Sequence, residues 1–148
     1  MHDLWLASIC VLCAFQLTAA VAQSAPNFEA LQKRLNDANA ELISLIRQPL
    51  LEFTKESPAS CDSKNLGKAS SYARLLVKFV DDGTISLGPR HLLDLGATIV
   101  DIADAARNAS CNDVARALYD HVIAAFIGAN HAPIRQRAEI AIQQLGTR

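Results

Sequence analysis

The chain has few aromatic residues and no segment in which apolar and polar residues alternate over the length of a strand. Aromatic residues make up 5% of its 148 residues, while alanine, leucine and isoleucine are abundant. Strands favour aromatic and β-branched residues in an alternating pattern, so these deficits argue against β-structure. Alanine and leucine are strong helix formers. The sequence therefore predicts an all-α fold.

The chain also lacks an excess of charge of either sign. It carries 14 basic and 15 acidic residues. Removal of residues 1–22 would take away only Asp3 among them and leave a net charge of zero. A nucleic-acid-binding protein normally shows a basic excess, so no nucleic-acid partner is expected. The chain contains neither an acidic tail, an internal repeat nor a low-complexity tract.

The longest apolar run lies at the N-terminus. It extends from Leu4 to Leu17 and is followed by the small residues of Thr18–Ala22. This order is typical of a secretory signal with an A-x-A cleavage site, and it predicts a signal peptide over residues 1–22. Residues 23–148 then form a single helical domain of an exported protein, either periplasmic or secreted.

An uncleaved anchor is the rival interpretation of this run. The segment Met1–Asp3 contains no lysine or arginine, which weakens the signal-peptide assignment. The stretch from Leu4 to Val21 is, however, marginal for crossing roughly 30 Å of hydrocarbon. No basic cluster follows it as a stop signal. We therefore expect cleavage and no stable membrane span afterwards.

Cleavage would also divide the four cysteines into two that are removed and two that remain. Cys10 and Cys13 would leave with the signal, so that Cys61 and Cys111 remain. Two cysteines in an exported domain indicate one disulfide. Their spacing differs from the C-x-x-C arrangement of redox-active pairs. We therefore expect a structural bridge that closes a loop of about fifty residues.

Apolar residues at helical spacing, together with cap residues, predict a bundle of about five helices. The first helix, over residues 27–47, has Asn27 as its cap. Pro49 either kinks this helix or starts a short second one from Leu50 to Glu56. After the polar linker Ser57–Ser63, four further helices are expected. The first of these ends at Gly83 and the second spans Pro89–Asn108. The third begins with Ser110 as its cap and ends at Gly128, and the fourth runs from Pro133 to Gly146. Leu95, Ile99 and Ile102 belong to the Pro89–Asn108 helix, which is apolar almost all round and should be central.

The first helix carries a regular apolar stripe. Its members are Phe28, Leu31, Leu35, Ala38, Leu42 and Leu45. Such a stripe can pack on the chain's own bundle, pair with a second copy, or lie in a partner's groove. Packing on the chain's own bundle is its ordinary role. Because Pro49 and the disulfide loop both follow it, this helix is also the expected surface for a protein partner or for self-association.

Candidate catalytic and metal-binding residues are sparse. His91 and Asp94 share a helix face, as do Asp101 and Asp104, but two ligands rarely hold zinc. His121 is expected to be half-buried packing and His131 solvated. Arg107, Arg116, Arg135 and Arg137 could gather near one another, although solvated surface is their ordinary role. Asn108 lies in an N-glycosylation pattern. No catalytic, cofactor-binding or metal-binding residue is predicted.

Three classes of function remain open. The favoured one is a small exported non-enzymatic protein that acts as a protein-binding or envelope accessory module. A carrier of a small apolar ligand held between helices is the first alternative. An enzyme with an unrecognised site is the second. The sequence leaves the partner, the ligand and the oligomeric state undetermined.

Overall fold

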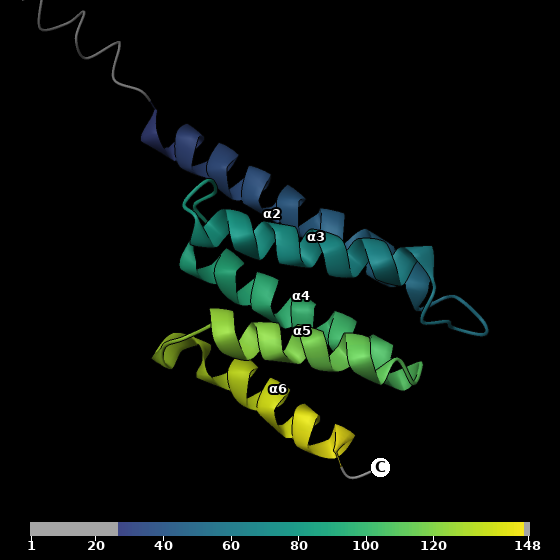
Figure 1. Cartoon of the computed structure of the whole chain (residues 1–148). Helices are drawn as coiled ribbons and strands as arrows, with labels where there is room; N and C mark the ends of the chain where they lie inside the picture. Colours follow the sequence, from purple (N-terminus) through teal and green to yellow (C-terminus); the bar gives the residue numbers. More distant parts are fainter. Residues whose placement is uncertain (1–26, 147–148) are drawn as a thin grey trace, which may run out of the picture. The chain divides into compact units, whose positions relative to one another are not determined.

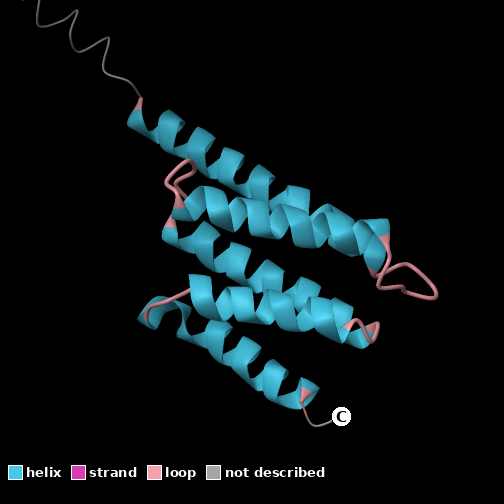
Figure 2. Cartoon of the chain, viewed as in Figure 1, coloured by secondary structure: helices cyan, strands magenta, loops and turns pink. Residues whose placement is uncertain are grey.

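A computed structural model describes residues 27–146 and shows five α-helices with one short 3-10 helix (Figures 1 and 2). The predicted signal peptide over residues 1–22 lies outside the described residues. The chain divides into two compact units, Met1–Leu35 and Asn36–Arg148. The α-helices are α2 (Phe28–Phe53), α3 (Lys64–Asp81), α4 (Pro89–Asn108), α5 (Asn112–Ala125) and α6 (Ala132–Leu145), and the 3-10 helix is Ala129–His131.

The all-α prediction is confirmed, since the described part of the chain contains no strand. In the second unit, α3, α4, α5 and α6 each run antiparallel to the helix before (Figure 1). Short connections enforce this topology, because they bring consecutive helices side by side. Within residues 27–146, no helix is both long enough and apolar enough to cross a membrane.

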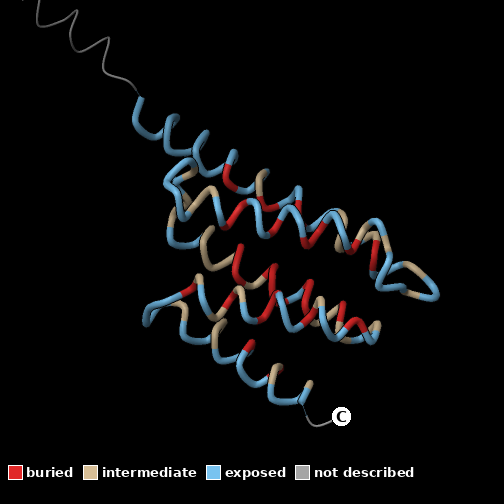
Figure 3. The backbone as a smooth tube through the Cα atoms, viewed as in Figure 1, coloured by how far each residue is buried: buried red, intermediate tan, exposed pale blue. Residues whose placement is uncertain are grey.

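Helix α4 is the centre of the second unit, as the sequence predicts. Its side chains Leu95, Ile99 and Ile102 are completely buried. It packs most closely against α5 and also contacts α3 and α6. Buried positions accordingly concentrate along α3, α4 and α5 (Figure 3). A helix that is apolar around most of its circumference is stable only where neighbours cover it on several sides.

Gly96 allows the end of α5 and the start of α6 to approach α4 closely. A Cβ atom at this position would lie 3.0 Å from the Phe126 ring and 3.2 Å from Ile134 Cδ1. The Phe126 ring in turn meets His131 edge-on, with ring centroids 5.6 Å apart. The absence of a side chain at position 96 therefore lets three helical elements share one packing site.

Helix α2 begins where the sequence predicts but extends beyond the expected end. The Oδ1 atom of Asn27 accepts a hydrogen bond of 3.3 Å from the backbone N–H of Ala30, which satisfies one free donor of the first turn. The helix then runs through Pro49 to Phe53, so no separate short helix begins at Leu50. Burial of Phe53 helps to offset the hydrogen bond that proline cannot donate.

Within the second unit, the buried face of α2 differs from the predicted stripe. Its buried residues are Asn39, Ile43, Ile46 and Phe53. Of the predicted stripe, Leu42 is partly buried and the other five residues are exposed. The stripe itself therefore packs on the chain's own bundle only through Leu42. Apolar residues stand next to each other at 42–43 and 45–46, so the helix has two adjacent apolar faces, and the bundle covers the second one.

A side-chain hydrogen bond joins α2 to α4. Arg47 Nε donates a hydrogen bond of 3.2 Å to Thr98 Oγ1. The Thr98 hydroxyl, which is buried, donates in turn to the Asp94 carbonyl over 2.7 Å. This chain of two hydrogen bonds satisfies a polar group that would otherwise be costly to bury.

Ser110 terminates α4. The prediction that Ser110 caps α5 is wrong. The φ of Ser110 is 62° and lies in the left-handed region. Its N–H donates to the Arg107 carbonyl over 2.9 Å, and the N–H of Cys111 donates to the Ala106 carbonyl over 2.8 Å. These two bonds form a Schellman motif, which usually places glycine where Ser110 stands. The N-cap of α5 is Cys111.

Replacing Ser110 with glycine should stabilise the protein. Glycine adopts a positive φ without the steric cost that serine bears, so we expect the free energy of unfolding to rise by about 0.5–1 kcal/mol. Urea unfolding followed by circular dichroism measures the change. Ser110→Ala, which keeps the Cβ atom, is the matched control and should give no such gain. A decrease for the glycine variant would contradict this account of the turn.

The predicted disulfide is present in the fold. Cys61 lies in the loop between α2 and α3, and Cys111 lies at the start of α5, with their Sγ atoms at bonding distance. Cys111 is buried, whereas Cys61 is exposed. The bridge therefore ties the α2–α3 loop to the turn between α4 and α5.

Candidate functional site

A cluster of charged side chains joins α4, α5 and α6. Asp104 accepts hydrogen bonds from the Tyr119 hydroxyl and from Arg137 Nη2. Arg137 Nη2 also donates to Asp101 Oδ1 over 2.9 Å, and Arg107 Nη2 lies 3.3 Å from Asp104 Oδ1. Asp101 and Asp104 thus share one face of α4, as their spacing predicts.

The ionisation of this cluster favours a structural role. Burial and the hydrogen bond to Asp104 raise the pKa of Tyr119 far above its ordinary value, so the phenol stays protonated. Partial burial lowers the pKa of Arg137, but the hydrogen bonds to Asp104 and Asp101 outweigh it and raise the pKa overall. Each charge therefore has its counter-charge within the cluster, which links three helices.

A cavity of about 410 Å³ borders this cluster. Its lining residues are Phe53, Thr54, Ala59, Asp101, Asp104, Ala105, Asn108 and Ala109. The two carboxylates are its charged groups, and both already bind Arg137. A ligand would have to compete with that arginine, so we regard the cavity as a weaker candidate site.

The predicted arginine group is only partly assembled. Arg107 and Arg137 meet at Asp104, whereas Arg135 pairs with Glu139 one turn away along α6, with Nε and Oε1 separated by 3.4 Å. Arg116 is exposed on α5. Sequence reasoning missed Tyr119, which is completely buried on α5. Its place between Ala115 and Val122, apolar residues one turn before and one turn after it, is the signal that could have revealed it.

The histidines lie apart from this cluster. His121 is half-buried, as predicted, and its Nε2 has no hydrogen-bond partner among the described residues. Burial, together with the positive charge of Arg74, lowers its pKa below the ordinary value against the opposing effect of Asp81. The prediction for His131 is wrong, because its ring packs against Phe126 and its Nδ1 is buried.

No metal centre is evident in the described part of the chain. Within residues 27–146, no three histidine, cysteine or acidic side chains are placed so that they could hold one metal ion together. His91 and Asp94, the spacing-based candidates, are both partly buried on α4.

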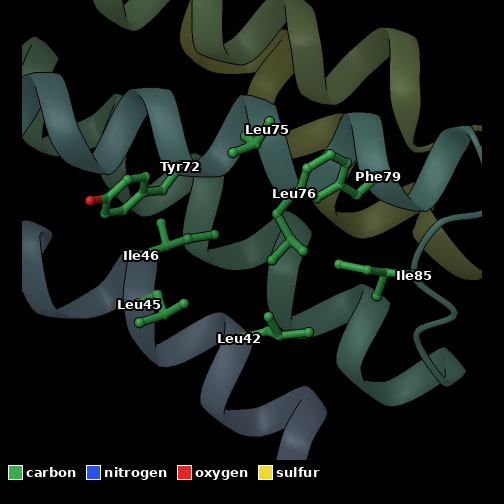
Figure 4. Close-up of a pocket in the computed structure, with 8 residues that line it drawn as sticks. All are labelled: Leu42, Leu45, Ile46, Tyr72, Leu75, Leu76, Phe79 and Ile85. Atoms are coloured by element: carbon green, nitrogen blue, oxygen red, sulfur yellow. The ribbon is translucent and has the colours of Figure 1, made fainter.

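An apolar groove between α2 and α3 is the strongest candidate for a functional site. It has a volume of about 360 Å³. Its lining residues are Leu42, Leu45 and Ile46 of α2, Tyr72, Leu75, Leu76 and Phe79 of α3, and Ile85 of the following loop. Figure 4 shows the α2 side chains facing those of α3, with Ile85 at one end. The Tyr72 hydroxyl is the one side-chain polar group among these eight residues.

The groove leaves several large apolar side chains exposed. Leu45 is 55% exposed, Leu75 46% and Tyr72 42%. Large apolar side chains exposed singly are normal, but adjacent ones that line a common groove mark an interaction site. The α2 side of the groove comes from the predicted stripe. On the α3 side, Tyr72, Leu75 and Phe79 were missed, although they stand at the i, i+3, i+7 spacing of a second apolar face.

In comparisons with known proteins, no family model, curated protein or solved structure matches the chain.

Proposed function

We propose that this protein is a small exported, non-enzymatic binding module whose α2–α3 groove takes an amphipathic helix of a polypeptide partner. The apolar groove is the single observation that carries the proposal. Two antiparallel helices with leucine side chains between them can accept the apolar residues of a third helix, spaced by three and four positions. The apolar run before Ala22 and the disulfide support export.

The chemistry of the groove favours binding over catalysis. Apart from the Tyr72 hydroxyl, its lining contains no group that could transfer a proton or attack a substrate. The acidic residues Asp101 and Asp104 belong to the separate cluster and are neutralised there by Arg107 and Arg137. We therefore assign those residues to stability and the groove to recognition.

A carrier of a small apolar ligand is the second candidate, because the same groove could hold such a molecule. Carrier sites generally bury 70–90% or more of their ligand. Here, Leu45, Tyr72 and Leu75 are each between 42% and 55% exposed, so the groove is open to solvent. An open groove suits the side chains of a helix better than an enclosed small molecule.

Site-specific photo-cross-linking in the exporting cell tests this function. A benzophenone side chain introduced at Leu75 should form an adduct with a polypeptide, and the second substitution Leu45→Glu should abolish that adduct. Ile140 of α6, which is 48% exposed against 46% for Leu75, is the matched control and should give none. Mass spectrometry of the adduct should identify an amphipathic helical segment.

Two outcomes would reject the proposal. One is equal cross-linking from positions 75 and 140, which would mean that contact is not specific to the groove. The other is the absence of any polypeptide adduct at position 75. If native mass spectrometry then shows a bound small molecule that is lost in Leu45→Glu, the carrier function replaces it.

A further inference from the structure

We propose that the helix taken up by the groove is α2 of a second copy of this chain, arranged antiparallel. This inference rests on the proposed function of the groove and names its occupant. Phe28 and Leu31 of the second copy would lie at Leu45 and Leu42, the α2 residues that line the groove. The contact is reciprocal, because each copy offers both a groove and a helix.

Helix α2 has a heptad pattern of apolar residues, most of which are exposed. Phe28, Leu35 and Leu42 occupy one core position of successive heptads, and Leu31, Ala38 and Leu45 occupy the other. Phe28, Leu31, Leu35 and Leu45 are 50% to 76% exposed, and Ala38 is also exposed. A seam of this kind, left exposed within residues 27–146, can pair with another seam.

The seam is complementary to itself in the antiparallel direction. When Leu35 lies opposite Ala38 of the second copy, Leu42 lies opposite its Leu31 and Leu45 opposite its Phe28. All six core positions are then matched with apolar ones in this single alignment. The small Ala38 opposite the larger Leu35 lets the two helices approach closely at the symmetry axis.

The flanking charges agree with the same alignment. Arg34 and Glu41 occupy equivalent positions beside the seam in successive heptads, on the side away from the buried residues Ile43 and Ile46. In the antiparallel pair, Arg34 of each copy lies beside Glu41 of the other. Both side chains are exposed, and neither has a salt bridge within residues 27–146. A parallel pair would not bring these two residues together.

The groove completes the site on the α3 side. Leu42 and Leu45 form its α2 wall, so residues placed opposite them also face Tyr72, Leu75 and Phe79 of α3. Phe28 is 76% exposed and supplies the large apolar side chain that such a groove accommodates. The second copy would therefore cover the exposed leucines of both helices.

Sedimentation equilibrium of the exported protein, with charge-reversed variants, tests the arrangement. We expect a dimer for the unchanged chain and for Lys33→Glu, an exposed matched control away from the seam. Leu45→Glu should weaken dimerisation at least ~100-fold, because each dimer contains two such contacts. Arg34→Glu should weaken it about tenfold, and the double variant Arg34→Glu/Glu41→Arg should restore it to within about threefold. Circular dichroism checks that each variant keeps its helices.

Two results would overturn the inference. The first is a monomer at concentrations up to about 100 µM, which would exclude a dimer of useful strength. The second is a dimer in which the double charge reversal remains as weak as the single one, since that would exclude the antiparallel alignment. A monomer that still forms the Leu75 cross-link with a different protein rejects the second copy but keeps the groove as a binding site. A monomer without the cross-link rejects both proposals.

Discussion

Replacing Ile99 with alanine is expected to lower the free energy of unfolding by about 2–5 kcal/mol. Ile99 is completely buried on α4, the helix that contacts α3, α5 and α6. The substitution removes three carbon atoms and leaves a cavity that the surrounding helices can fill only in part. The loss combines the transfer energy of these atoms with the dispersion contacts missing around the cavity.

Urea unfolding followed by circular dichroism measures this effect. The midpoint should fall while the slope of free energy against urea concentration stays unchanged, because the same surface is exposed on unfolding. Ile140→Ala on α6 makes the same chemical change at a site that is 48% exposed, and it should shift the free energy by no more than about 0.5 kcal/mol. Equal effects of the two substitutions would show that α4 is not the core helix.

Removing the disulfide should cost a similar amount. The bridge joins residues separated by 50 positions in the sequence, and a loop of this length corresponds to about 4 kcal/mol in the chain-entropy account. Cys61→Ala/Cys111→Ala should therefore lower the free energy of unfolding by about 2–5 kcal/mol. Alanine is used at position 111 because a serine hydroxyl would be buried there without an assured partner.

The helix content should survive this change, since the helices depend on core packing and not on the bridge. Reduction of the unchanged protein should reproduce the destabilisation of the double variant, which separates loss of the bridge from loss of the thiols. Titration of the exported chain, unfolded without reductant, should find no free thiol at positions 61 and 111. Two titratable thiols at these positions would mean that the bridge does not form in the cell.

The sequence was a good guide to where helices begin and end. Asn27, Gly83, Pro89 and Pro133 mark boundaries within a residue or two of the observed ones. These signals act through hydrogen bonds and dihedral preferences over about four residues, which the local sequence already contains. The prediction for Ser110 was wrong because serine can either cap a following helix or end a preceding one. Here the hydrogen bonds to the last turn of α4 place it at the end of that helix.

Only part of the α2–α3 groove could be predicted from the sequence. Leu42 and Leu45 belong to the predicted stripe, whereas most of the α3 wall and the choice of the buried α2 face were missed. Periodicity identifies an apolar face but does not say what covers it. Likewise, the spacing of Asp101 and Asp104 placed them together, but their partners Tyr119 and Arg137 come from other helices.

The sequence by itself determined the helical class, the number of helices, the central place of α4 and the pair of cysteines that form the bridge. The helices follow from residue type, spacing and cap residues, which act locally. The cysteine pair follows because no other cysteine remains once residues 1–22 are removed. Only the tertiary structure decided which face of α2 is buried, that the helix continues through Pro49, and that a groove remains between α2 and α3. Those outcomes depend on the packing of side chains far apart in the sequence, because the burial of Ile43, Ile46 and Phe53 selects one of two adjacent apolar faces and leaves the other open.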